Sequence, residues 1–250
     1  MEPPPPPCVC TGKIFAACRT PDDAGALNAL WQFNPSRLTI LPLDVTCEAS
    51  LAAAAATIGP RIDLLVNTVG ILHDPAVAAD AGTPGGVPET SIARVDPAWF
   101  THTIRVNTLG PLLVAKHLSP ALATRSSARS RPTAAAGRPA SVFATLSARV
   151  GSIGDNRLGG WYSYRVSKAA LNQATRTLAI ELRRKGVTVV GLHPGTVATA
   201  LSAPFRKNVP AGQLLAVDDA AARLLDVLDS LDADADAGTV LAYDGSTVPF

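Results

Sequence analysis

Short apolar runs recur along the chain, separated by longer segments in which apolar positions follow helical spacing. Each run is bounded by polar or turn-forming residues, which is typical of strands. The predicted strands are residues 13–18, 38–43, 62–66, 141–145, 187–192 and, near the end of the chain, 239–243. Several of them lack polar alternation, as expected for strands that are buried on both faces of a parallel sheet.

Amphipathic or alanine-rich segments stand between these runs. They predict helices over residues 22–31, 48–58, 97–123, 161–185 and 217–231. Asp22 is placed to cap the first of these helices. Strands that alternate with helices predict an α/β fold, in which helices cover both faces of a parallel sheet. We find no internal repeat and no linker, so a single domain is expected.

Three segments depart from this alternation. Residues 1–12 form a proline-rich head, which we expect to be disordered. Residues 71–96 lack periodicity and are rich in Gly, Pro, Ala and Asp, which predicts a long surface loop. Residues 124–139 carry four arginines among Ser, Ala, Pro and Gly, and we expect a disordered insertion there. A nucleic-acid patch is disfavoured because no aromatic residues are interleaved with these arginines.

Composition narrows the class of protein. The 250 residues are 47% hydrophobic and 17% charged, which excludes a disordered or fibrous chain. The net charge of +2 implies no strong attraction to nucleic acid or to a membrane surface. The four cysteines lack the paired spacing of a metal site, so we expect no metal, reduced thiols and a cytoplasmic location. Neither a signal peptide nor a membrane helix is predicted, and the Gly-x-Ser-x-Gly motif of a hydrolase is absent.

Polar residues follow several predicted strands, at the positions where an open parallel sheet binds its ligands. These positions are Arg19, Asp44, 67–70, 147–152 and 194–199. Tyr164 and Lys168 stand four residues apart in a predicted helix and therefore share one helical face. Because a nearby cation stabilises a phenolate, the pair predicts a tyrosine acid whose pKa is lowered by Lys168. The spacing alone is also compatible with an ordinary helix.

Five motifs in fixed order resemble the short-chain dehydrogenase/reductase family. They are Leu43-Asp44-Val45, Asn67-Thr68-Val69-Gly70, Val106-Asn107, Tyr164-Arg165-Val166-Ser167-Lys168 and Pro194-Gly195-Thr196-Val197-Ala198-Thr199. The residues around 146–162 and 243–245 resemble the carbonyl-reductase-like branch, which includes the bacterial cell-contact factor-like proteins. The resemblance spans residues 13–250 and implies a Rossmann-like doubly wound sheet. It also implies hydride transfer between a nicotinamide dinucleotide and a carbonyl or alcohol.

The resemblance implies a role for each matching position. Tyr164 would protonate the carbonyl oxygen, Lys168 would assist it and reach the nicotinamide ribose, and Asn107 would anchor a water relay through a distortion of its helix. The other implied cofactor contacts are Asp44 at the adenine, Asn67 and Gly70 on the adenosine side, and Pro194, Gly195, Thr196 and Thr199 in the motif that holds the carboxamide. Each of these positions is also compatible with a structural role in a turn or at a strand end.

Two positions bear on the details of the chemistry. The family serine that binds the substrate carbonyl is Ser147, which fits the strand end, or Ser152, which fits the usual spacing to the tyrosine; we favour Ser147. Arg19 stands where a carboxylate would select NAD. An arginine at this place suits the 2′-phosphate of NADP, so NADP is the expected cofactor and NAD the alternative.

The family's first strand and its glycine-rich turn have no counterpart in this sequence. The proline-rich head cannot supply a central strand, so the two strands that flank the missing one are expected either to have unpaired edges or to pair in another way. Two interpretations follow: a carbonyl reductase that lacks its amino-terminal unit, or a non-catalytic relative that binds a partner. The resemblance implies a small-molecule substrate under the apolar segment 201–215, and a homo-oligomer formed through residues 97–123 and 161–185.

Overall fold

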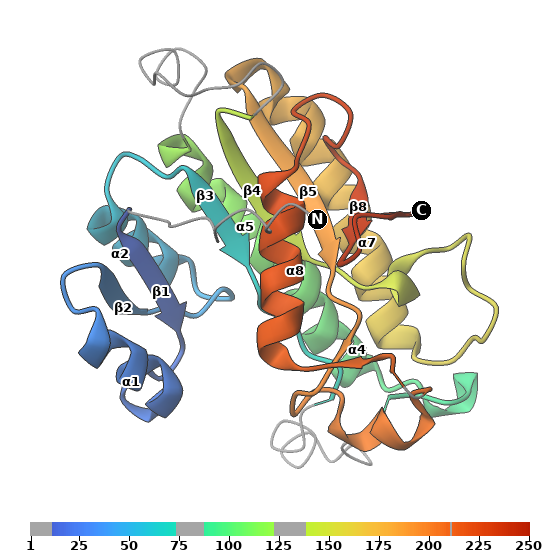
Figure 1. Cartoon of the computed structure of the whole chain (residues 1–250). Helices are drawn as coiled ribbons and strands as arrows, with labels where there is room; N and C mark the ends of the chain where they lie inside the picture. Colours follow the sequence, from blue (N-terminus) through green and yellow to red (C-terminus); the bar gives the residue numbers. More distant parts are fainter. Residues whose placement is uncertain (1–11, 74–87, 123–138, 211) are drawn as a thin grey trace, which may run out of the picture. The chain divides into compact units, whose positions relative to one another are not determined.

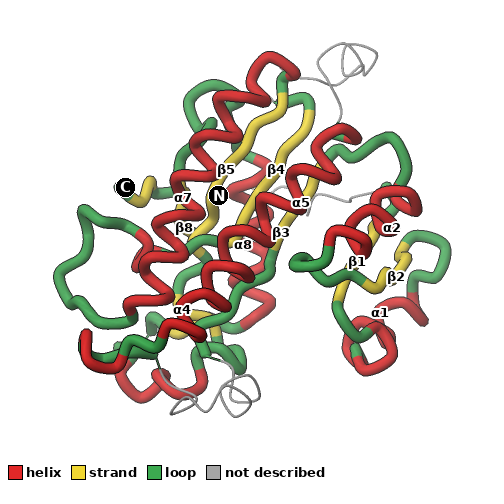
Figure 2. Tube along the Cα trace, turned by 180° about the vertical axis from the view of Figure 1, so that it is seen from behind, coloured by secondary structure: helices red, strands yellow, loops and turns green. Residues whose placement is uncertain are grey.

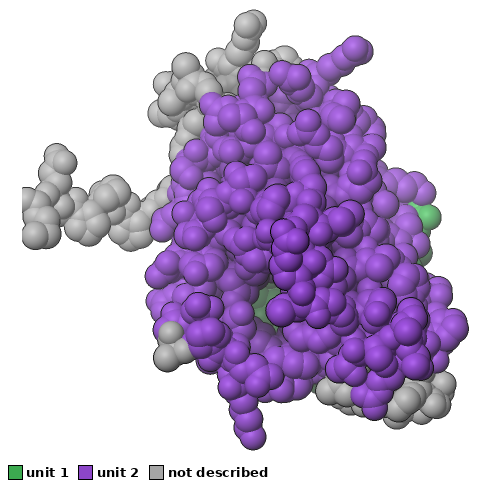
Figure 3. Space-filling view, turned by 90° about the vertical axis from the view of Figure 1, so that its right-hand side faces the viewer, with its two compact units in different colours: residues 1–59 green, residues 60–250 purple. Residues whose placement is uncertain are grey.

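The computed structural model describes residues 12–73, 88–122, 139–210 and 212–250. The chain divides into two compact units, residues 1–59 and 60–250, which are coloured separately in Figure 3 and are described here one at a time. The expected proline-rich head and the expected insertion lie outside the described residues, apart from Gly12 and Pro139. That the chain forms a single domain stays a prediction.

The first unit is a parallel strand pair with two helices. Its elements are β1 (Ile14–Cys18), a 3-10 turn η1 (Pro21–Asp23), α1 (Gly25–Phe33), β2 (Leu38–Pro42) and α2 (Glu48–Ile58). The register pairs Ile14 with Leu38 and Cys18 with Pro42. The predicted cap at Asp22 is wrong, because Asp22 lies inside η1 and the residue that precedes α1 is Ala24.

The second unit is built on a five-stranded sheet (Figure 1). The strand order is β3 (Leu64–Asn67), β4 (Ser141–Leu146), β5 (Val187–His193), β8 (Val240–Ala242) and β9 (Thr247–Val248). All pairs are parallel except the pair of β8 with β9. The short strands β6 (Thr196–Val197) and β7 (Leu214–Leu215) pair separately. The sequence did not predict β6, β7 or β9, because two residues are too few to show a period.

Helices cover both faces of this sheet, as expected. On one face lies α8 (Val217–Asp229), and just past its end Leu231 joins Val227 in a core with Val142, Val190 and Leu241. The other face carries α5 (Gly110–Leu118) and α7 (Tyr162–Leu182), which Figure 2 shows from behind. Among the described residues, no helix combines the length and the apolar character needed to cross a membrane.

The helix predicted over residues 97–123 runs through consecutive helical turns as far as residue 121 and is distorted in its middle. It consists of α4 (Pro97–Ile104), the π-helical turn η3 (Arg105–Leu109), α5 and the 3-10 turn η4 (Ser119–Ala121). Pro111 has no N–H and cannot donate to the carbonyl of Asn107 four residues earlier, which interrupts the α-helical ladder at this place.

The surface loop expected over residues 71–96 is also partly wrong. Residues 74–87 lie outside the described residues, but Glu89 is only 5% exposed and residues 92–94 form the 3-10 turn η2 (Ile92–Arg94). Glu89 is buried because it bonds to the start of α7, a tertiary contact that no local pattern shows.

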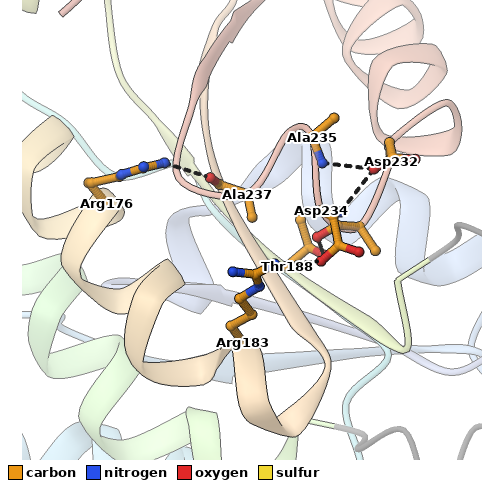
Figure 4. Close-up of polar contacts among 8 residues, drawn as sticks. Arg176, Arg183, Thr188, Asp232, Asp234, Ala235 and Ala237 are labelled. Carbon is orange, nitrogen blue, oxygen red and sulfur yellow. Dashed lines mark hydrogen bonds and ion pairs between the residues drawn. The ribbon is translucent and has the colours of Figure 1, made fainter.

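The turn that follows α8 is fixed by polar contacts (Figure 4). The Asp232 carboxylate accepts from the amides of Asp234 and Ala235 at 2.9 and 2.8 Å. From α7, Arg176 donates to the carbonyl of Ala237 at 3.1 Å. The Arg176 contact joins the C-terminal half of α7 to the segment that leads into β8.

The strands β1 and β3 each have one edge without a strand partner in the described part of the chain. In the described residues β1 pairs with β2 and β3 pairs with β4, and no other strand continues either ladder. On β3, Leu64 and Val66 are 45% and 38% exposed. That the family's first strand has no counterpart in this sequence stays a prediction.

Candidate active site

One face of α7 carries the candidate catalytic residues of the second unit. Tyr164, Lys168, Asn172 and Thr175 follow one another at helical spacing, and all four are buried. The sequence analysis identified the first two and missed Asn172. The signal was available, because Asn172 lies one further helical turn beyond Lys168.

The Lys168 ammonium lies where β3 and β4 end. Its Nζ donates to the carbonyl of Leu146 at 2.8 Å and lies 5.7 Å from the centre of the Tyr164 ring. A Cβ on Gly70 would come within 3.1 Å of the same Nζ. A glycine at position 70 therefore provides the space in which the lysine amine sits.

Asn107 lies in the π-helical turn, so the distortion implied by the family resemblance is present. Its Oδ1 accepts from the amide of Ile71 at 2.8 Å, and its Nδ2 donates to the carbonyl of Ile71 at 2.8 Å. The same Nδ2 donates to Ser167 Oγ at 3.0 Å. Asn107 thus connects the segment after β3 to Ser167 of α7, the residue that precedes Lys168. The water relay stays a prediction.

The two candidate serines have different partners. Ser147, just after β4, donates from Oγ to Oδ1 of Asn172 at 2.5 Å. Ser152 Oγ accepts from the amide of Asp155 at 3.0 Å and so closes a turn. Both are buried. Ser147 is therefore linked to the α7 face that bears Tyr164, whereas Ser152 is bonded within its own loop.

Burial shifts the pKa values of both Tyr164 and Lys168. It raises the pKa of Tyr164 to about 12 and lowers the pKa of Lys168 to about 8. Desolvation accounts for the rise in the Tyr164 pKa, and the Lys168 amine bonds to the carbonyl of Leu146. That Lys168 lowers the tyrosine pKa stays a prediction. Tyr164 is protonated at neutral pH and able to donate a proton.

The segment after β5 is shaped by close packing. Gly195 has a φ of +75°, and a Cβ there would come within 2.8 Å of the Tyr243 ring. Thr199 begins a turn in which its carbonyl accepts from Arg206 at 2.6 Å. Pro194 and Thr196 are half-buried beside them. Packing by itself accounts for the glycine at position 195.

Asn67 ends β3 and is 5% exposed. Its Nδ2 is buried and makes no hydrogen bond to any group in the described ranges. A buried amide donor without a partner is costly, and it is a donor suited to a ligand.

Aromatic rings stand beside the tyrosine. The ring centre of Trp161 lies 6.3 Å from that of Tyr164 and 4.9 Å from that of Phe205. His73 in turn meets Phe205 at 6.2 Å. Phe205 belongs to the segment expected to cover a substrate, in the 3-10 turn η7 (Ala203–Asn208).

The two candidates in the first unit are described within that unit. Arg19 follows β1 and is exposed. The Asp44 carboxylate accepts from the amide and the hydroxyl of Thr46, both at 2.8 Å, and so shapes the turn before α2. Their expected roles at the adenosine end of a cofactor stay predictions.

Comparisons with known proteins cover nearly the whole chain. Residues 12–246 match the family model described as enoyl-(acyl carrier protein) reductase. The chain is 34% identical over 160 residues to the C-signal protein of Myxococcus xanthus, covering 64% of this chain and 84% of that protein. It is 31% identical over 198 residues to a 1-hydroxy-2-glutathionyl-2-methyl-3-butene dehydrogenase of Rhodococcus sp. (strain AD45), covering 78% and 73%.

Solved structures give the same picture. An NADPH-bound carbonyl reductase from chicken fatty liver superposes with a TM-score of 0.77 at 30% identity, covering 95% of this chain and 88% of that chain. The carbonyl reductase Sniffer of D. melanogaster superposes with a TM-score of 0.79 at 25% identity, covering 100% and 90%.

Proposed function

The chain belongs to the short-chain dehydrogenase/reductase family and is an NAD(P)-dependent oxidoreductase, and from this premise we propose that it reduces a carbonyl group with NADPH. A solved relative at 30% identity is a carbonyl reductase that holds NADPH. The exposed Arg19 supports NADPH over NADH, because a guanidinium pairs with a 2′-phosphate through charge-assisted hydrogen bonds.

The described residues of the second unit fit a nicotinamide cofactor. Gly70 leaves space beside the Lys168 amine, and the Asn67 amide offers a buried donor without a partner. Lys168 would hold the ribose hydroxyls, and Thr199 with residues 194–196 would hold the carboxamide. Arg19 and Asp44 would hold the adenosine end. A bound reduced nicotinamide supplies the hydride.

The residues of the chain supply the proton. Tyr164, whose phenol is protonated at neutral pH, donates its hydroxyl proton to the carbonyl oxygen of the substrate. Ser147 polarises the same oxygen once its hydroxyl turns from Asn172. Next to the tyrosine, the Lys168 amine is held by its hydrogen bond to the carbonyl of Leu146. The Asn107 side chain is held by its hydrogen bond from the amide of Ile71.

One observation carries the proposal most strongly. Lys168, Asn107 and Gly70 come from three separated segments and meet beside the buried Tyr164, with Gly70 leaving room for the amine. A non-catalytic relative that binds only a partner has no need of this set, and the comparisons favour an enzyme. The aromatic rings of Trp161 and Phe205 suit a small apolar carbonyl compound.

The compartment and the assembly are proposed more briefly. A cytoplasmic location remains the proposal, because the spacing of the four cysteines favours reduced thiols. A homo-oligomer would form through the helices of residues 97–123 and 161–185, where Leu109, Val166 and Ile180 are exposed.

The test follows the oxidation of NADPH by absorbance with a panel of aromatic and aliphatic aldehydes and ketones. Tyr164→Phe is expected to lower kcat by about 100- to 10,000-fold, because only the donated proton is lost. Tyr162→Phe, two residues away on the same helix, is the matched control and keeps the wild-type rate. Turnover retained by Tyr164→Phe would show that another group is the acid.

A second variant tests the choice of cofactor. Arg19→Ala is expected to weaken NADPH binding and leave NADH binding unchanged, because only NADPH carries the 2′-phosphate. Fluorescence titration of the wild-type and variant chains with each cofactor measures this ratio. An unchanged ratio would remove Arg19 from the cofactor site.

A further inference from the structure

The first turn of α7 is held by a carboxylate that lies 74 positions earlier in the sequence. Both oxygens of Glu89 lie 3.3 Å from the backbone nitrogen of Ser163, and the Ser163 hydroxyl donates to Oε1. Glu89 is 5% exposed and Ser163 is fully buried. The contact is therefore a charge-assisted network in the interior.

The backbone of Glu89 fixes the residues that lead into the helix. Its carbonyl accepts from the amide of Trp161 at 2.5 Å. Gly160 and Trp161 have φ values of +65° and +53°, and a Cβ on Gly160 would lie 3.4 Å from the Glu89 carbonyl. A left-handed tryptophan persists only where its surroundings hold it.

A second residue holds the turn from the other side. Arg165 donates from Nε to the carbonyl of Gly160 at 3.0 Å and from Nη1 to the carbonyl of Val150 at 3.2 Å. The turn that precedes α7 is thus clamped between Glu89 and Arg165.

Glu89 caps the start of α7, where the local sequence provides no capping side chain. The first amides of an α-helix have no acceptor within the helix, and the helix start carries a partial positive charge. The residue that precedes α7, Trp161, has no side-chain oxygen and forms no side-chain cap. The carboxylate of Glu89 supplies both the acceptor and the negative charge.

Tyr164 is the next residue after Ser163, and Trp161 lies against its ring. We propose that Glu89 is a positioning residue that fixes the Tyr164 hydroxyl and the Trp161 ring by holding the amide and the hydroxyl of Ser163. The inference rests on the proposed carbonyl reduction. Glu89 touches neither the substrate nor the cofactor in this scheme and acts only through the helix start.

The variants that test this are Glu89→Gln, Glu89→Ala and Ser163→Ala in the full chain. Glu89→Gln keeps the size of the side chain but removes the charge and one acceptor. A misplacement of about 1 Å is enough to slow a reaction by about 100-fold, so kcat is expected to fall by about 10- to 100-fold in Glu89→Gln and further in Glu89→Ala. The Kd for NADPH is expected to stay within about twofold, since the binding residues are untouched.

Two further readouts separate positioning from loss of folded protein. Each rate is divided by the concentration of NADPH-binding sites found by titration, so that unfolded molecules do not lower the measured kcat. With NADPH deuterated at the transferred position, the isotope effect on kcat rises in the Glu89 variants, because hydride transfer becomes slower than the other steps. Asp232→Asn, which removes a carboxylate that accepts two backbone amides far from α7's start, is the matched control and keeps the wild-type kcat and isotope effect.

The outcomes are distinguishable. A wild-type chain that oxidises no NADPH with any carbonyl overturns the proposed function, and this inference with it. An active wild type whose Glu89 variants keep kcat and the isotope effect overturns the positioning role alone. A fall in kcat for Glu89→Gln at constant NADPH affinity, with nearly no further loss when Ser163→Ala is added, supports the role, because both changes break the same contact.

Discussion

The burial of Lys168 has a thermodynamic consequence that is independent of catalysis. Its pKa falls from an ordinary value of 10.5 to about 8 because burial disfavours the ammonium. Between these two values the unfolded chain binds a proton that the folded chain does not. Stability therefore rises with pH through this window, and below pH 8 the charged amine costs roughly 3 kcal/mol of folding free energy.

We predict that the wild type gains stability relative to Lys168→Met as the pH rises from 8 to 10. The gain reaches at most about 1.4 kcal/mol per pH unit, and Lys168→Met, which has no amine to titrate, lacks it. Urea unfolding of both proteins at pH 7, 8, 9 and 10 measures the difference between their free energies of unfolding. The titration of groups that both proteins share contributes equally to each value and drops out of this difference. Parallel curves would show that the amine is not desolvated.

Tyr164 acts in the opposite direction at higher pH. Its pKa is raised to about 12 in the folded chain, so between 10 and 12 the folded state keeps a proton that the unfolded state loses. Stability then falls as the pH rises. A protonated phenol is the carbonyl-reducing form, and the raised pKa of Tyr164 widens the pH range in which this form is present.

At the residue scale, local spacing identified some site residues and could not identify others. The four-residue spacing of Tyr164 and Lys168 was sufficient to place them on one helical face. Ser147 was placed at a strand end but its partner, Asn172, was not foreseen, although it continues the same helical face. Glu89 lay in a segment interpreted as a surface loop, because its partner is 74 positions away and only the tertiary fold brings them together.

At the scale of elements, the π-helical turn η3 between α4 and α5 matters most for the site. The π-helical turn frees the Asn107 side chain from the regular helix spacing, and its amide bonds to both backbone groups of Ile71 and to Ser167. Asn107 is completely buried. Loss of the amide removes the side-chain partner of both half-buried backbone groups of Ile71 and of the buried Ser167 hydroxyl.

We predict that Asn107→Ala lowers the free energy of unfolding by about 2–5 kcal/mol, since each buried polar group left unsatisfied costs about 1–3 kcal/mol. The expected effect on NADPH oxidation is also large, because the segment after β3 is released. Urea unfolding measures the first effect. Asn156→Ala, which removes one exposed contact to the Gly159 amide, is the control and changes stability by less than about 1 kcal/mol.

An Asn107→Ala protein as stable as the control would contradict this account of the π-helical turn. Gly110 and Pro111 were the signal in the sequence for this π-helical turn. The apolar pattern runs through both residues, so it predicted one helix. Elsewhere the pattern was sufficient: α2 matches its predicted bounds, residues 48–58, because an alanine-rich segment between two strands has one stable conformation.

At the scale of the whole molecule, the two units differ in how their strands are paired. In the described part of the chain β1 is bonded only to β2, in a unit whose helix α1 buries none of its residues. By contrast, β4 and β5 are paired on both sides, and Val189 and Val190 are fully buried. The sequence predicted the six longer strands but not which of them pair, because pairing is set by the tertiary fold and not by the local pattern.

These differences predict unequal protection from hydrogen exchange. Amides of β1 and β2 are expected to exchange on the order of 100-fold faster than those of β4 and β5, because a two-stranded pair opens at a lower free energy than the centre of a larger sheet. Exchange followed by mass spectrometry on the full chain measures the ratio. Equal protection in both units would show that they open together.

The same measurement decides whether the first unit takes part in cofactor binding. If Arg19 holds the 2′-phosphate, NADPH at about 100 times its Kd stabilises the bound state by about 2.7 kcal/mol and slows exchange in β1 by up to about 100-fold. NADH at the same ratio to its own Kd serves as the comparison, and Arg19→Ala is expected to lose the protection specific to NADPH. Slower exchange in β4 and β5 without any change in β1 would mean that the second unit binds the cofactor by itself, and that neither Arg19 nor Asp44 contributes to the site.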